Sequence, residues 1–171
     1  SDICFTWNGT TSGVKIPNAD WISDYRLGIT FCDATSAIFS QEIAWEKLDV
    51  ITFSWQKAMG GEGGHGVIIL SPKAINRLEN FSPDRPIPKV LRLGAKNLSN
   101  SGLFEGGTIN TPSMLCVADA LDSLLWIKEI GGWKGTYSRC QHNFKVLSDW
   151  YQKREWITNL VRLENIQSNT S

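Results

Sequence analysis

Four short apolar runs constrain the fold of this chain more than any other feature of its sequence. They cover residues 3–7, 27–32, 50–55 and 67–70. The second run shows little alternation of apolar and polar residues, which is typical of a strand covered on both faces. Helical segments are predicted around the runs, at 36–47, 71–81, 111–131 and from about 136 to 150 or 160. Strands of this kind separated by helical connections predict an α/β layered domain.

Two of the predicted helices carry clear start signals. Ser71 and Pro72 form an N-cap followed by a proline at the first helical position. Thr111 and Pro112 give the same signal for the longer helix, and Gly131 is its expected stop. A broad apolar face is expected on this longer helix, at Met114, Val117, Leu121, Leu124 and Trp126. Residues 82–109, rich in Pro, Gly, Asn and Ser, are predicted to form a long irregular loop.

The composition limits the partners of the chain. Its 171 residues fit one domain, 42% are hydrophobic, and the formal net charge is zero. A zero balance gives no electrostatic footprint for nucleic acid or an anionic membrane. No apolar stretch approaches the roughly 20 residues of a membrane-spanning helix. The four cysteines are widely spaced, which argues against a zinc site and indicates reduced thiols in an intracellular protein.

Polar residues follow three of the apolar runs, at 8–11, 33–36 and 54–57. If the three strands are parallel, these ends converge on one crevice, where ligands of α/β sheets bind. The crevice would then hold the Asp33 carboxylate and the Lys57 amine. Pyridoxal 5′-phosphate requires an amine for a Schiff base and a carboxylate beside its pyridine nitrogen. On the residues alone, the alternative of solvated loop side chains stays open.

The glycines after Lys57 match the pattern GxGxxG at Gly61, Gly63 and Gly66. A dinucleotide-binding fingerprint must open a helix, whereas a strand-like run follows here, so that interpretation is rejected. A steric role is favoured, in which glycines allow sharp turns and close approach to a flat ligand. Glu62 and His65 are interpreted as structural residues of this turn. Asn110 and Thr111 precede a helix, where either a phosphate site or plain capping is possible.

Several segments together resemble the phosphoserine aminotransferase family, which belongs to the class V aminotransferases of fold type I. They read FTWNGTTSGV, DATSAIF, FSWQKAMGGEGGHGVIILSPKAINRLE, PIPKVLRL and FEGGTINTPSMLCVADALDSLLWIKEIGGW. The resemblance covers nearly the whole chain in the same order. It implies a three-layer large domain with a mixed, mostly parallel sheet flanked by helices. Residues 1–160 would be part of this cofactor-binding domain, and 161–171 the start of a truncated small domain.

The resemblance also implies roles for individual residues. Lys57 is expected to form the Schiff base with pyridoxal 5′-phosphate and then to shuttle a proton between substrate and cofactor, while Asp33 pairs with the pyridine nitrogen. Thr10, Ser36 and Gln56 match positions that contact the cofactor. Asn110 and Thr111 match the motif that reaches the cofactor phosphate of the neighbouring subunit. No metal is expected.

The implied reaction transfers an amino group from glutamate to 3-phosphohydroxypyruvate, giving O-phosphoserine and 2-oxoglutarate in serine biosynthesis. A cytoplasmic homodimer with shared active sites is expected, with no nucleic-acid or membrane partner. A related preference for phosphohydroxythreonine stays open.

The chain also departs from the family pattern. The preceding large-domain segment and the small domain are absent, and Gln167 stands where the family has an arginine, so the substrate-phosphate arginines are not assigned. A middle fragment is therefore expected. Two alternatives remain: a non-catalytic remnant or interaction domain of the same fold, and another class V enzyme such as an alanine–glyoxylate aminotransferase or a cysteine desulfurase.

Overall fold

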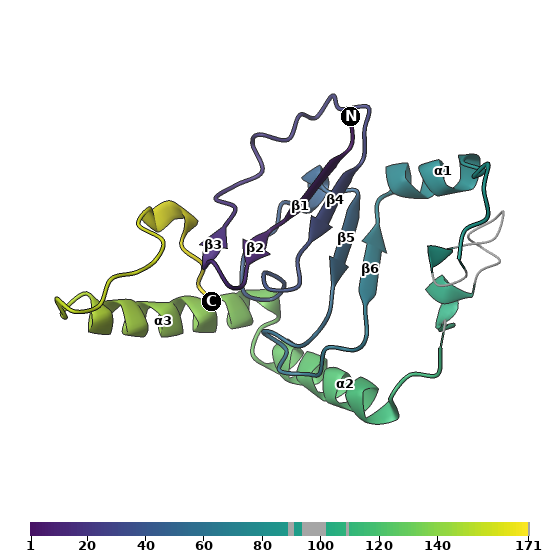
Figure 1. Ribbon diagram of the computed structural model, residues 1–171. Helices are drawn as coiled ribbons and strands as arrows, with labels where there is room; N and C mark the ends of the chain where they lie inside the picture. The colour runs from purple at the N-terminus through teal and green to yellow at the C-terminus, as the bar shows by residue number, and fades with distance from the viewer. Residues whose placement is uncertain (89–90, 94–101, 109, 171) are drawn as a thin grey trace.

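A four-stranded sheet organises the chain. The computed structural model describes residues 1–88, 91–93, 102–108 and 110–170. The sheet order is β1-β4-β5-β6, formed by β1 (Ile3–Thr6), β4 (Thr30–Asp33), β5 (Val50–Phe53) and β6 (Val67–Leu70) (Figure 1). β1, β4 and β5 are parallel, and β6 runs antiparallel to β5. The predicted mixed, mostly parallel sheet is confirmed.

The strand register places three polar residues in one row. Thr6 of β1 pairs with Asp33 of β4, which pairs with Thr52 of β5. Because the three strands are parallel, their carboxyl ends lie at one edge of the sheet, as the sequence predicted. β4 starts at Thr30, later than the run at 27–32 suggested, because Leu27 is 91% exposed and lies before the sheet.

A small hairpin follows β1 that the sequence did not predict. β2 (Asn8–Gly9) and β3 (Val14–Lys15) pair antiparallel, and Gly13 turns between them with a positive φ of 67°. The C-terminal segment packs here, since Gln167 forms a bridge with Val14 and the Ser168 N–H donates to the carbonyl of Gly13 at 2.8 Å. The hairpin is therefore the place where the C-terminal segment contacts the N-terminal part of the chain.

The apolar core lies on both faces of the sheet. One cluster contains Cys32 and Ile51 with residues of the connecting segments, including Ile22 and Leu48. The other packs Val50 against Ala74 of α1 (Pro72–Asn80). The predicted N-cap of α1 is confirmed, because the Ser71 side chain accepts a hydrogen bond from the Ala74 N–H at 3.1 Å.

The segment 36–47 does not form the predicted short helix. Only a 3₁₀ turn, η1 (Trp45–Lys47), is present there. Phe39 adopts a positive φ of 62°, which ends any helical turn that starts at Ala34. The buried Ser40 hydroxyl then donates to backbone carbonyls of the preceding turn. Local hydrogen bonds of this kind compete with a continuous helix.

Two longer helices follow the loop, α2 (Met114–Glu129) and α3 (Trp133–Tyr151). Gly131 and Gly132 separate them with φ values of 100° and 71°, so the predicted stop is confirmed. α3 starts slightly earlier than predicted and ends at Tyr151, so its extension toward residue 160 is wrong.

The predicted apolar face of α2 is not the face that packs on this chain. The buried residues of α2 are Cys116, Ala120 and Ile127. Met114 is 74% exposed, Leu121 is 57% exposed, and Val117, Leu124 and Trp126 are exposed as well. Cys116 and Ala120 are small and allow α2 to lie close to the loop after β5, and Ile127 packs with Met59 of that loop. The other large apolar residues of α2 remain on its outer surface.

Two further 3₁₀ turns lie in the irregular segments, η4 (Leu103–Glu105) and η5 (Glu164–Ile166). The irregular loop predicted at 82–109 falls partly outside the described residues, at 89–90, 94–101 and 109. Within the described ranges, no helix is long and apolar enough to cross a lipid bilayer.

A buried carboxylate organises the amino edge of the sheet. Asp49, 4% exposed, accepts hydrogen bonds from Arg26 at 3.0 Å, the Thr30 N–H at 3.0 Å and the Ser71 hydroxyl at 2.9 Å. Burial by itself raises the pKa of Asp49, but the three donors outweigh it and hold the pKa below its ordinary value. Asp49 thus ties the starts of β4, β5 and α1 together.

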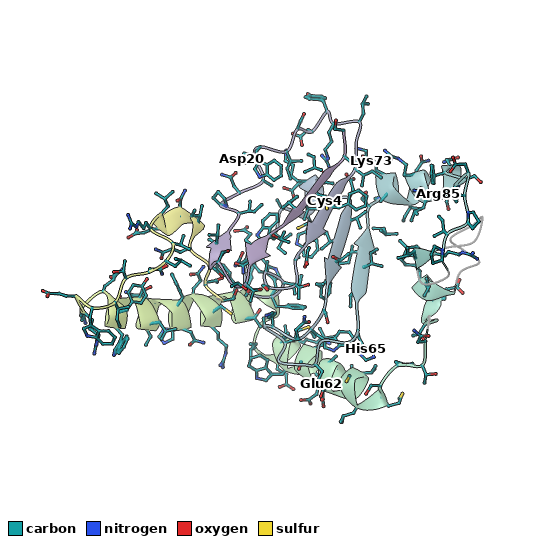
Figure 2. All side chains as sticks on the ribbon, in the orientation of Figure 1. Cys4, Asp20, Glu62, His65, Lys73 and Arg85 are labelled. Carbon is teal, nitrogen blue, oxygen red and sulfur yellow. The ribbon has the colours of Figure 1, made fainter. Side chains whose placement is uncertain are left out.

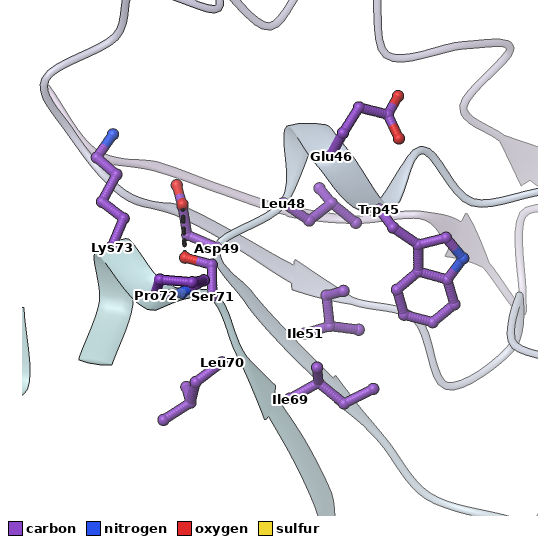
Figure 3. Close-up of a pocket in the computed structure, with 10 residues that line it drawn as sticks. All are labelled: Trp45, Glu46, Leu48, Asp49, Ile51, Ile69, Leu70, Ser71, Pro72 and Lys73. Carbon is purple, nitrogen blue, oxygen red and sulfur yellow. Dashed lines mark hydrogen bonds between the residues drawn. The ribbon is translucent and has the colours of Figure 1, made fainter. Parts of the chain in front are cut away.

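A groove of about 590 Å³ opens beside Asp49 (Figure 3). Its lining includes Trp45, Leu48 and Ile69, with the Asp49–Ser71 hydrogen bond at one side. The groove lies at the amino end of β5, at the opposite edge from Asp33 and the segment that follows β5. It is therefore separate from the edge where the sequence places the chemistry.

Candidate active site

Asp33 is fixed by its backbone and presents its side chain to solvent. Its carbonyl accepts the Trp7 N–H at 2.9 Å, and the Ala34 N–H donates to the carbonyl of Thr52 at 2.8 Å. The exposed carboxylate accepts the Thr35 N–H through Oδ1 at 2.9 Å. Within the described part of the chain, Oδ2 makes no hydrogen bond and is available to a ligand.

Two predicted cofactor contacts come together beside Asp33. The Thr10 and Ser36 hydroxyls hydrogen-bond to each other across 26 residues of sequence. Ser36 is buried, and its carbonyl accepts the Thr170 hydroxyl at 3.0 Å. The turn after β2 and the turn after β4 therefore meet at the carboxyl edge.

A buried amide pair that the sequence analysis missed supports these turns. Gln41 Nε2 donates to Asn8 Oδ1 at 2.7 Å, and both residues are buried. The pair joins the turn after β4 to β2. Its two members lie 33 residues apart, and no short motif signals such a contact.

Lys57 lies in the loop after β5, which runs from Ser54 to Gly66 and is called the Lys57 loop below. The loop folds tightly, since the Gly60 N–H donates to the Lys57 carbonyl and the Gly61 N–H to the Trp55 carbonyl, both at 2.9 Å. The Lys57 side chain is exposed and forms no hydrogen bond or ion pair with any described residue. It is thus a free amine at the edge that carries Asp33.

Two glycines of the loop leave room for side chains of the same loop. Gly60 has a positive φ of 71°. A Cβ at Gly61 would lie 2.6 Å from Trp55 Cδ1, and one at Gly63 would lie 3.1 Å from Gln56 Cδ. The space expected for a flat ligand is therefore occupied by Trp55 and Gln56 at these two positions. Gln56, a predicted cofactor contact, is exposed and packs on the loop.

His65 and Glu62 attach the loop to α2, and Figure 2 shows both beside that helix. His65 stacks on Trp55 with ring centroids 5.2 Å apart, and its Nε2 accepts the Ser113 N–H at 3.3 Å. The Cys116 thiol donates to Glu62 at 3.4 Å. The interpretation of both residues as structural parts of the turn is confirmed, although the sequence did not indicate their partner helix.

Asn110 and Thr111 are exposed immediately before α2. Thr111 is not the cap that was predicted, because Ser113 caps α2 by accepting the Cys116 N–H at 3.5 Å. Neither residue hydrogen-bonds to Asp33 or Lys57 in the described part of the chain. The first turn of α2 nevertheless lies against the Lys57 loop through His65 and Glu62.

Phosphoserine aminotransferases are among the known proteins that this chain resembles in sequence. The chain is 52% identical over all 171 residues to phosphoserine aminotransferase of Methanosarcina mazei, of which it covers 46%. The chain therefore spans a little under half the length of this relative.

Solved structures share the fold. A phosphoserine aminotransferase from Cytophaga hutchinsonii aligns with a TM-score of 0.78 at 21% identity, over 98% of this chain and 46% of that one. A PLP-bound phosphoserine aminotransferase from Trichomonas vaginalis aligns with a TM-score of 0.71 at 18% identity, over 97% of this chain and 42% of that one. The predicted aminotransferase fold is confirmed.

The Aminotransferase class-V family matches residues 3–136, which is most of the chain and includes Asp33, Lys57 and the start of α2. The chain belongs to the class-V aminotransferase family.

Proposed function

We propose that this chain is the part of a phosphoserine aminotransferase that carries the cofactor lysine. The observation that carries the proposal is the arrangement at the carboxyl edge: Asp33 ends β4, and the Lys57 loop follows the parallel neighbour β5. The 52% identity to the Methanosarcina mazei enzyme supports phosphoserine and 2-oxoglutarate as the substrates, or glutamate and 3-phosphohydroxypyruvate in the opposite direction. Because the relatives are about twice as long, the remaining substrate contacts would come from outside this chain.

The donor set at this edge fits pyridoxal 5′-phosphate. Asp33 offers a carboxylate oxygen without a partner in the described chain, and Lys57 offers an amine without an ion pair. The Thr10 and Ser36 hydroxyls, which bond to each other, come from turns that follow β2 and β4 at this edge. When bound, this cofactor supplies an aldehyde for the amino group and an aromatic ring that accepts electrons.

The residues of the chain divide the work in this proposal. Asp33 holds a proton on the ring nitrogen, which keeps the ring cationic. Lys57 would hold the cofactor through Nζ and would carry a proton to and from the substrate Cα. Thr10, Ser36 and Gln56 orient the cofactor, and Asn110 and Thr111 bind its phosphate across a subunit boundary.

A homodimer is part of the proposal. Large apolar side chains on the outer side of α2 support it, because contiguous exposed apolar patches mark interaction surfaces. Leu115 and Leu125, 69% and 53% exposed, belong to this set and lie on the helix that follows Asn110 and Thr111. Sedimentation of Leu125→Glu against wild type measures whether α2 contributes to the dimer.

The domain assignment is proposed on the same basis. Residues 1–160 form part of the large domain, and 161–171 begin a small domain. The hydrogen bonds of Ser168 to Gly13 and of Asn169 to Ser40 would then hold the start of the small domain against the large one. A cytoplasmic enzyme in serine biosynthesis, without a nucleic-acid or membrane partner, completes the proposal.

The test is an assay of glutamate formation from 2-oxoglutarate and phosphoserine. The chain is assayed alone and together with an N-terminal segment of the kind that the relatives carry. Phosphoserine-dependent glutamate that disappears in Lys57→Ala, but persists in Lys134→Ala on the surface of α3, supports the proposal. Cofactor binding without transamination of phosphoserine would instead support a non-catalytic module or another class V enzyme.

A further inference from the structure

We propose that His65 is a positioning residue that completes the N-terminal cap of α2 and thereby couples the Lys57 loop to Asn110 and Thr111. The effect on cofactor binding rests on the proposed function. The contact between His65 and the start of α2 does not depend on it.

The start of α2 lacks one partner that a capping box normally supplies. Ser113 is the N-cap, and its hydroxyl accepts the N–H of Cys116, three residues on. In a capping box, a Glu or Gln at that third position accepts the N-cap N–H in return. Cys116 offers a thiol that donates to Glu62 instead. The Ser113 N–H is accepted by His65, 48 residues earlier in the chain.

The acceptor is held in place by the Lys57 loop. His65 stacks on Trp55 at an interplanar angle of 18°, and Trp55 lies against Gly61, where only glycine leaves room for the indole. Nε2 of this ring faces the Ser113 N–H and serves as its acceptor at 3.3 Å. Nδ1 is shielded from solvent and has no partner in the described chain, so Nε2 makes the hydrogen bond that links this ring to α2.

Further contacts make the loop and α2 one unit. The Ser123 hydroxyl donates to the carbonyl of Met59 at 2.8 Å. Met59 packs with Ala120 and Ile127 of α2, and Trp55 contacts this cluster. His65 is the contact at the end of the unit that faces Asn110 and Thr111, which precede Ser113 by three and two residues. A displacement of Trp55, two residues before Lys57, is therefore transmitted to the predicted phosphate-binding residues.

The test is hydrogen–deuterium exchange on the chain without added cofactor. In His65→Ala we expect the amides of residues 110–117 to exchange about fivefold faster, as for the loss of one hydrogen bond, with the strands unchanged. His65→Gln keeps an acceptor of similar reach and should restore the wild-type rate, whereas the shorter His65→Asn should not. His142→Ala, an exposed histidine on α3, is the matched control.

Two results would overturn the inference. One is an unchanged rate at 110–117 in both His65→Ala and His65→Asn. The other is equal acceleration in every segment, which indicates general destabilisation; should His65→Ala fail to fold, the Gln and Asn variants give the same comparison.

Pyridoxal 5′-phosphate, used alone as a probe, then separates this inference from the proposed function. We expect His65→Ala to retain it about fivefold less tightly with an unchanged absorption band. If the wild-type chain binds no pyridoxal 5′-phosphate, the proposed function is contradicted and the exchange result still stands. If wild type and His65→Ala retain it equally, the coupling of His65 to the cofactor site is overturned.

Discussion

Asp33, the last residue of β4, pairs in parallel register with Thr52 of β5. This relationship brings the carboxylate and the loop that carries Lys57 to the same edge of the sheet. The two predicted chemical groups thus come from adjacent strands, although they lie 24 residues apart in the sequence.

Replacing Asp33 by asparagine tests the role of this carboxylate. We expect Asp33→Asn to weaken binding of pyridoxal 5′-phosphate at least tenfold, because an amide cannot hold the ring nitrogen protonated. The Thr35 N–H can still bond to the amide oxygen, so the fold should be retained. Equilibrium titration followed by absorbance measures the change. Binding equal to wild type would remove Asp33 from the site.

Asp49 should make the stability of the chain depend on pH in the acid range. Its folded pKa lies below the unfolded value, near 3.8, so the charged form stabilises the fold above that pH. The contribution disappears as the pH falls through the folded pKa. We expect Asp49→Asn to lose about 3 kcal/mol of unfolding free energy at pH 7 and to flatten the acid slope.

The control for Asp49 is Arg77→Ala. Arg77 pairs with Asp2 at 3.7 Å, but both side chains are about half exposed, so the expected change is below about 0.5 kcal/mol. Urea unfolding between pH 3 and 7 measures both variants. An acid slope that is the same in Asp49→Asn and wild type would contradict the role given to this carboxylate.

Gly61 should tolerate no side chain, whereas Gly64 should. A Cβ at Gly61 meets Trp55 Cδ1 at 2.6 Å, while no atom of the described residues lies within 4 Å of one at Gly64. We expect Gly61→Ala to displace the indole and cost about 1–3 kcal/mol, with a change in tryptophan fluorescence. Gly64→Ala should leave both nearly unchanged. Equal effects at the two positions would contradict the packing of Trp55 in the loop.

The cysteines should differ in reactivity. Burial, together with the neighbouring Asp33 charge, raises the pKa of Cys32 to about 12, whereas Cys4 is exposed. Because the thiolate is the reactive form, iodoacetamide at pH 8 should modify Cys4 and leave Cys32 intact until the chain unfolds. Peptide mapping by mass spectrometry measures the two sites. Modification of Cys32 at the rate of Cys4 would show that β4 is not covered as described.

The sequence predicted the parts of the fold that depend on local pattern. Runs of apolar residues located β1, β5 and β6, and the Ser71–Pro72 pair located the start of α1. The polar strand ends were predicted to converge, and the parallel register of β1, β4 and β5 confirms this. These features can be predicted because hydrophobic periodicity and helix capping act over a few neighbouring residues.

The predictions that were wrong concern features that depend on contacts between distant segments or on an unusual backbone conformation. Ser113 caps α2 in place of Thr111, and its own N–H is accepted by His65, far back in the chain. Phe39 interrupts the segment 36–47 with a left-handed backbone conformation. Glycine or asparagine usually marks such a position in a sequence, and a phenylalanine does not. The face of α2 that packs is formed by Cys116, Ala120 and Ile127, and the first two are too small to stand out in a pattern of large apolar residues.

Reduction of the cofactor-treated chain with borohydride identifies the lysine that binds the cofactor. Pyridoxal 5′-phosphate is added, the absorption band of the lysine-bound cofactor is recorded, and borohydride makes the attachment permanent for peptide mapping. We expect one pyridoxyl group on Lys57 and none in Lys57→Arg, with Lys134→Arg labelled like wild type. A label spread over several exposed lysines, or a band that persists in Lys57→Arg, would contradict it.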